Sequence, residues 1–152
     1  MTTLINKRHG LETMSTDAER LIRRLYQEVW NEGNDEAVAE LLAEDFVHRG
    51  NIAPDGTTGP DGYREFVREI VAAFHDTRVE LVTVVGEDRT VAARWVAHGT
   101  HEGAYVGIEP TGRRVSTNGV SFAEVEDGVI RELWDLYDTN ALLSQLGVLD
   151  EE

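Results

Sequence analysis

The sequence contains no cysteine and only three prolines among its 152 residues. The lack of cysteine excludes disulfides, thiolate metal sites, iron–sulfur clusters and thiol nucleophiles. No run approaches the roughly 18 consecutive apolar residues of a membrane-spanning helix, and the opening residues lack the apolar centre of a secretory signal. We therefore expect a cytoplasmic protein whose chemistry comes from carboxylates, histidines, hydroxyls or amides.

Positive charge is also scarce. Fourteen Lys and Arg residues stand against 29 Asp and Glu residues, which gives a formal net charge of −15. An excess of this size repels phosphate backbones and anionic lipid surfaces. Neither nucleic acid nor a membrane is an expected partner.

Lysine in particular is almost absent, because Lys7 is the one lysine and the other positive residues are arginines. An acidic, lysine-poor surface is typical of a halophilic protein in a salt-rich cytoplasm, where cations screen the self-repulsion. We expect the midpoint temperature of unfolding to rise steeply with KCl concentration, as measured by thermal denaturation. Equal stability at low salt would contradict the expectation.

Length and composition predict one globular domain with a single core, since 41% of the residues are hydrophobic. Residues 1–14 carry no periodicity and are expected to be a disordered leader, with either Met1 or Met14 as the true start. The domain is predicted over residues 15–149.

The front half of the chain carries a period of 3.6 residues, which is typical of helices. Thr16-Asp17-Ala18-Glu19 forms a capping box, and Gly33 supplies a stop. Asp35 is predicted to cap a second helix, and Pro60 sits where a first-turn proline belongs. The predicted helices cover residues 17–32, 35–44 and 60–74, with an irregular loop over 48–59.

After Asp76 the period changes to 2, which is typical of strands. Turns at 86–89 and 126–128 predict two hairpins. The expected strands cover residues 79–85, 90–100, 115–125 and 129–137, and a last short helix covers 139–146. This order predicts an α+β fold in which the helices cover one face of a curved antiparallel sheet, with a site inside the resulting cone.

Two carboxylates near the end of the last strand compete for that site. Strand alternation places Asp138 on the face of Trp134 and Leu136, whereas Asp135 and Tyr137 lie on the other face. We take Asp138 as the inner residue, because a carboxylate among apolar neighbours suits proton transfer near neutral pH. Two alternatives stay open: the aromatic Tyr137 favours the other face, and Asp138 could instead cap the helix that begins near Thr139.

The histidines do not predict a metal site. His98 and His101 are three apart on a strand and so face opposite ways, while His48 and His75 are isolated. No ligand motif with the spacing of a metal site occurs. His101 is expected either to line the pocket or to make a loop hydrogen bond.

Several motifs together resemble a known family. The quoted segments are WVAHGTHEG at 95–103, GIEPTGRRV at 107–115, Asp127-Gly128 followed by Trp134 and Asp138, QLG at 145–147, and the front segments 26–34 and 41–47. In order and spacing, over residues 16–149, they resemble the SnoaL-like polyketide cyclases, also called ester cyclases.

The resemblance implies a cone-shaped α+β fold shared with nuclear transport factor two and ketosteroid isomerase, usually in a homodimer packed through the sheet. It also implies a cofactor-free intramolecular aldol cyclisation of a small, hydrophobic polyketide-like ester, which is lyase or isomerase chemistry. Asp138 matches the acidic residue that takes a proton from the carbon between two carbonyls and returns it to the new alkoxide. His101 matches a pocket-lining position and is the second candidate catalytic residue.

The remaining candidates are expected to bind substrate. They are Tyr26, Trp30, His48 and Trp134, with Asn118 and Glu124 as weaker candidates. The chain departs from the family pattern at His48-Arg49-Gly50 and at Phe74-His75-Asp76. Two other functions remain possible: a non-catalytic module that binds a small hydrophobic ligand, and an isomerase or a hydrolase in the same pocket, the hydrolase using Arg94 with Asp138.

Overall fold

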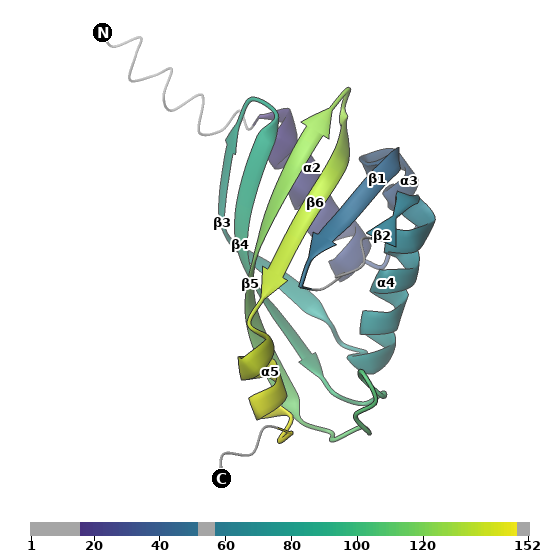
Figure 1. Cartoon of the computed structure of the whole chain (residues 1–152), viewed down its shortest axis with the longest axis vertical. Helices are drawn as coiled ribbons and strands as arrows, with labels where there is room; N and C mark the ends of the chain where they lie inside the picture. The colour runs from purple at the N-terminus through teal and green to yellow at the C-terminus, as the bar shows by residue number, and fades with distance from the viewer. Residues whose placement is uncertain (1–15, 52–56, 149–152) are drawn as a thin grey trace, which may run out of the picture.

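A computed structural model describes residues 16–51 and 57–148 (Figure 1). The predicted leader lies outside the described residues. The described helices and strands follow one another in the order α2 (Asp17–Arg24), η1 (Leu25–Asn31), α3 (Ala37–Leu41), β1 (Leu42–Gly50), β2 (Thr57–Thr58), α4 (Gly59–Ala73), β3 (Arg78–Glu87), β4 (Thr90–Thr100), β5 (Arg114–Glu126), β6 (Val129–Tyr137) and α5 (Thr139–Gln145).

The strands form one curved, unclosed sheet in the order β2-β1-β6-β5-β4-β3. All neighbours are antiparallel except β1 and β6, which run parallel. Helix α2 lies behind the sheet, α4 runs beside β1 and β2, and α5 sits below β6 (Figure 1). The predicted α+β fold with a helix-covered, curved sheet is confirmed.

The strands of the back half match the alternation of the sequence closely. β4 and β6 have the predicted bounds, and β3 and β5 extend one to two residues further at their ends. The β5–β6 turn uses Asp127 and Gly128, both with positive φ. This conformation suits a two-residue hairpin turn and is accessible to Asp and Gly.

The prediction for residues 42–59 is wrong in one respect. Helix α3 ends at Leu41, and Leu42–Gly50 forms strand β1 instead of more helix and loop. β1 owes its strand conformation to pairing with β6, with His48 beside Leu133 and Gly50 beside Asp135. A partner so distant in sequence leaves no local signal. Most of the rest of the predicted loop, residues 52–56, lies outside the described residues.

The first helix begins as predicted but changes type. Thr16 caps it by accepting a hydrogen bond from the Glu19 amide at 3.1 Å, while the Glu19 carboxylate accepts one from the Gly86 amide of β3. From Leu25 onward the helix widens to the π type and forms η1. π-Helical turns are often found at functional sites, and η1 carries Tyr26 and Trp30.

Candidate active site

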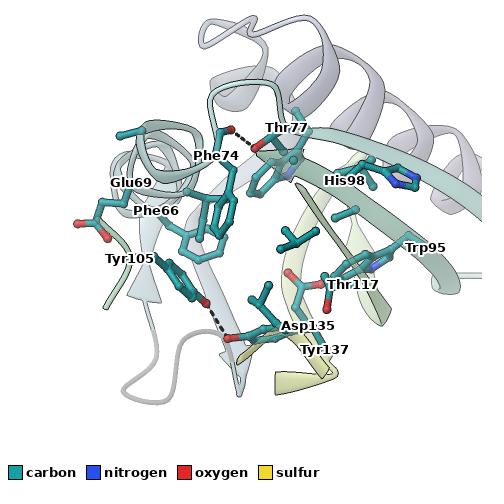
Figure 2. Close-up of a pocket in the computed structure, with 18 of the residues that line it drawn as sticks. Phe66, Glu69, Phe74, Thr77, Trp95, His98, Tyr105, Thr117, Asp135 and Tyr137 are labelled. Atoms are coloured by element: carbon teal, nitrogen blue, oxygen red, sulfur yellow. Dashed lines mark hydrogen bonds between the residues drawn. The ribbon is translucent and has the colours of Figure 1, made fainter. Parts of the chain in front are cut away.

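A cavity of about 720 Å³ opens between the concave face of the sheet, η1 and α4. Its walls are mostly apolar and aromatic. They include Trp30 of η1, Phe66 of α4, Trp95 of β4 and Tyr137 of β6. Figure 2 shows aromatic side chains ringing the space, with the carboxylate of Asp135 among them. Cavities of several hundred Å³ with apolar walls and few polar groups are typical of small-molecule sites.

Asp135 is the buried acid of this cavity, with 3% of its surface exposed. Its Oδ2 lies 2.7 Å from Nε2 of His48, which stands on the neighbouring strand β1. Its Oδ1 accepts a hydrogen bond from Ser121 of β5 and lies 3.3 Å from the Tyr26 hydroxyl. A buried carboxylate needs such donors, because desolvating an unpaired charge is costly.

Ser121 links the carboxylate to two aromatic residues. Its Oγ accepts a hydrogen bond from the Trp95 indole N–H at 2.8 Å and lies 2.7 Å from the Tyr26 hydroxyl. A hydroxyl offers one donor and two acceptor positions. Ser121 donates its own proton to Asp135 and accepts from Trp95. The single proton of Tyr26 is shared between Ser121 Oγ and Asp135 Oδ1.

The tautomer of His48 follows from its surroundings. The ring is fully buried among Phe46, Tyr63 and Phe66, and its Nδ1 has no hydrogen-bond partner in the described part of the chain. A neutral ring with its proton on Nε2 donates to Asp135 and leaves only a lone pair unpaired at Nδ1. His48 thus serves Asp135 as a hydrogen-bond donor.

Two buried tyrosines stay protonated beside this carboxylate. Burial raises the pKa of Tyr26 well above its usual value, and the negative charge of Asp135 raises it further. The same two causes raise the pKa of Tyr63, whose hydroxyl accepts a hydrogen bond from the Trp30 indole at 2.8 Å. Tyr26 therefore acts as a neutral O–H donor in the site.

The other side of the cavity is bounded by the segment between β4 and β5. Ala104, Tyr105 and Val106 of this segment line the cavity. The Tyr105 hydroxyl lies 2.9 Å from that of Tyr137, a contact that joins the segment to β6 (Figure 2). Burial raises the pKa of Tyr105 as well, so its hydroxyl stays protonated and available for hydrogen bonding.

The prediction that Asp138 faces the pocket is wrong. Its side chain is exposed and caps α5, accepting a hydrogen bond from the Ala141 amide at 3.0 Å. Trp134 was placed on the same inner face, but it is 46% exposed on the opposite side of the sheet, beneath the guanidinium of Arg49. The alternative reading of Asp138 as a helix cap describes the structure.

A bulge in β6 explains both errors. Glu132 pairs with Glu124, but the next pair is Ile130 with Val125, so β6 carries an extra residue at Arg131. Because side chains alternate along a strand, one extra residue exchanges the two faces beyond it. Counting from the buried Ile130 therefore gives the wrong face for every later residue of the strand.

Three more candidates also lie outside the cavity. Asn118, Glu124 and Arg94 are exposed on the convex face of the sheet, where Glu124 is bonded to the Thr90 hydroxyl. Alternation on β5 directs the neighbours Thr117 and Ser121 inward instead. The expected role of Asn118 and Glu124 at the pocket, and the hydrolase arrangement with Arg94, are not compatible with this placement.

His101 is fully buried but does not line the cavity. Its Nδ1 accepts a hydrogen bond from the Thr111 amide at 3.1 Å, and the ring packs against Phe74. The loop hydrogen bond that was the alternative for His101 is the observed arrangement. It ties together the ends of the segment that carries Tyr105.

Of the predicted substrate-binding residues, Tyr26 and Trp30 line the cavity, while His48 lies behind Asp135. Sequence reasoning missed Ser121, Trp95 and Tyr63. Trp95 is buried and also faces the cavity. Ser121 carried no signal, because a single serine in a strand is common and its partners lie far away in sequence.

The described ranges contain neither a candidate metal site nor a helix that could span a membrane. Between residues 16 and 51 and between 57 and 148, no three His, Asp or Glu side chains are grouped so that they could hold a metal ion. Nor is any helix in these ranges long and apolar enough to cross a membrane.

Comparison with known proteins agrees with the geometry. The family described as SnoaL-like polyketide cyclase matches residues 20–146. The nogalonic acid methyl ester cyclase of Streptomyces nogalater is 32% identical over 119 residues, which are 78% of this chain and 89% of that protein.

Two crystal structures extend the comparison. IdmH of Streptomyces antibioticus, a candidate polyketide cyclase, has a TM-score of 0.76 and 31% identity, covering 88% of this chain and all of the other. AclR of Streptomyces galilaeus, a candidate hydroxylase, has a TM-score of 0.77 and 26% identity, covering 89% of this chain and 87% of that one. This chain belongs to the SnoaL-like polyketide cyclase family.

Proposed function

We propose that the protein is an ester cyclase that closes a ring of an aromatic polyketide by intramolecular aldol addition, with Asp135 as the catalytic residue. The observation that carries the proposal is the buried carboxylate of Asp135 in the wall of a large, mostly apolar cavity. The assignment replaces Asp138 by the acid three residues earlier.

The reaction requires one proton to leave and return. Asp135 takes a proton from the carbon between two carbonyls of the substrate, and the resulting enolate attacks a ketone carbon of the same molecule. A carbon–carbon bond forms, and Asp135 returns the proton to the new alkoxide, so the product is an isomer of the substrate. In general acid–base catalysis of this kind, one base held in the correct position is sufficient.

The neighbours of Asp135 are positioning residues. His48 holds one carboxylate oxygen, and Ser121 and Tyr26 hold the other. These contacts fix the carboxylate plane before the substrate enters, which lowers the reorganisation needed in the transition state. The surrounding aromatic walls exclude water and favour a flat substrate with several fused rings.

The proposal is tested by incubating the purified chain with nogalonic acid methyl ester. This molecule is chosen because a relative is named as its cyclase. We expect a product of unchanged mass with a new retention time in liquid chromatography. Mass gain by one oxygen atom would instead indicate hydroxylation, the activity suggested for AclR.

A second function, ligand binding without turnover, is favoured by one observation. Asp135 already has protein partners on both oxygens, and a carboxylate held in this way can be purely structural. This alternative predicts that the ester binds and is recovered unchanged.

We also propose that the convex face of the sheet forms a homodimer contact. The exposed apolar residues Val120, Phe122, Trp134 and Leu136 are cross-strand neighbours on β5 and β6. A contiguous exposed apolar patch of this kind is typical of an interaction surface.

Trp134→Glu is expected to convert a dimer into a monomer, because it places a charge in the apolar patch. Analytical ultracentrifugation would show the mass fall from twice 17.0 kDa to 17.0 kDa. Val148→Glu is the matched control, since Val148 is 44% exposed away from the sheet. A monomeric wild-type chain would contradict the proposal.

A further inference from the structure

The cavity rim contains a turn with an unusual residue. Tyr105 and Ile108 exchange both backbone hydrogen bonds, at 3.0 and 2.7 Å, and enclose the two-residue turn Val106-Gly107. Both central residues have positive φ, 42° at Val106 and 83° at Gly107. Such turns favour Asn, Asp or Gly at the first position, because a β-branched side chain is strained there.

The other turns of the chain follow this preference. Besides Val106, the described non-glycine residues with positive φ are Asp88 and Asp127. Asp127-Gly128 in the β5–β6 hairpin is the same kind of turn with a favoured residue. Val106 is therefore the exception among the described turn residues with positive φ.

Packing within the chain does not compensate for the strain. Val106 is 74% exposed, the highest value among the exposed large hydrophobic residues described. Its neighbours Tyr105 and Ile108 pack against the small core cluster that contains Phe74 and Leu142, but Val106 does not. The flanks hold the turn in place while the valine side chain stays uncovered at the cavity.

We propose that Val106 is a specificity-determining residue whose side chain is covered by the apolar ring system of the bound ligand. The inference rests on the proposed function only in that the cavity is the ligand site. A bound ring surface removes the valine from water, and this gain is available only in the complex. Backbone strain at a cavity rim that no contact offsets in the free protein is expected of a residue that contacts a bound ligand.

The variant Val106→Asn separates the backbone strain at this position from the apolar contact with the ligand. Asparagine tolerates the turn and lacks the apolar surface, so the unfolding temperature should rise by about 2–4 °C. The dissociation constant for anthraquinone, a flat three-ring diketone, should rise about 5- to 10-fold. Quenching of tryptophan fluorescence measures it, because Trp30 and Trp95 line the cavity. Val106→Ile keeps the strain and the apolar surface and should bind at least as well as wild type.

Two control variants isolate the position. Asp127→Val introduces the same strain into the β5–β6 turn and should lower the unfolding temperature without changing anthraquinone binding. Val85→Asn removes a valine that is 61% exposed on β3, away from the cavity, and should leave anthraquinone binding unchanged.

The outcomes are distinct. An anthraquinone affinity of Val106→Asn within twofold of wild type, or a lowered unfolding temperature, overturns the inference. If the wild-type protein does not bind anthraquinone, both the inference about Val106 and the assignment of the cavity as the ligand site are overturned. Wild-type binding without ring closure of the ester defeats the proposed cyclase activity and leaves the role of Val106 standing.

Discussion

Replacing Asp135 with asparagine is expected to lower the turnover number about 10²- to 10⁴-fold, the usual contribution of a general base. Asparagine has the same shape, and its oxygen still accepts from Ser121 and Tyr26. Its amide group donates to His48 if the ring moves its proton to Nδ1. The loss in the free energy of unfolding should stay below about 2 kcal/mol. Ring closure measured by chromatography and urea denaturation measured by circular dichroism give the two values.

Asp138→Asn is the matched control for this variant. Asparagine caps a helix as well as aspartate does, so neither stability nor turnover should change. Asp138→Ala should cost about 1 kcal/mol in the free energy of unfolding, because the Ala141 amide loses its acceptor. Loss of turnover in Asp138→Asn, with full turnover in Asp135→Asn, would restore the assignment made from strand alternation.

Replacing Gly50 with alanine is expected to destabilise the protein by about 3 kcal/mol or more. Gly50 has a φ of 112°, and an added Cβ would lie 1.9 Å from the backbone oxygen of Asp135. β1 would have to separate from β6 at Asp135, the residue proposed to act as the base. Because a displacement of about 1 Å can cost about 100-fold in rate, turnover should fall even in the molecules that remain folded.

The variant Gly33→Ala is the control that separates the backbone strain of a positive φ from the steric contact with Asp135. Gly33 also has a positive φ, 71°, but an added Cβ there meets no atom within 4 Å. Its cost should be about 1 kcal/mol, the strain of the left-handed conformation alone. Urea denaturation of both variants gives the comparison, and equal midpoints would contradict the close approach between Gly50 and Asp135.

The sequence predicted the fold correctly where the local pattern of apolar, polar and turn residues determines the secondary structure. The alternation in residues 90–100 and 129–137 defined β4 and β6 to the residue, because each strand is bounded by turn residues and pairs with a close neighbour in sequence. β1 was missed because its partner is β6, at the other end of the chain. The apolar spacing of residues 38–42 continues the helical period and hides the change at Leu42.

The site was predictable in kind and not in position. An acid near the end of the last strand, apolar walls and the roles of Tyr26 and Trp30 as lining residues follow from the sequence and its resemblance. The choice between Asp135 and Asp138 depended on the bulge at Arg131, and bulges leave no sequence signature in a strand of mixed polarity. His48 belonged to the unpredicted strand, so its contact with Asp135 could not be expected.

The position of β6 in the sheet has a consequence for synthesis of the protein on the ribosome. β6 follows the other five described strands in the sequence, yet it lies between β1 and β5. A nascent chain that ends before Val129 has β1 without its inner neighbour and His48 without its carboxylate. The contact between His48 and Asp135 therefore forms only when β6 inserts between β1 and β5, so a product that ends before Val129 would lack the carboxylate proposed to act as the base.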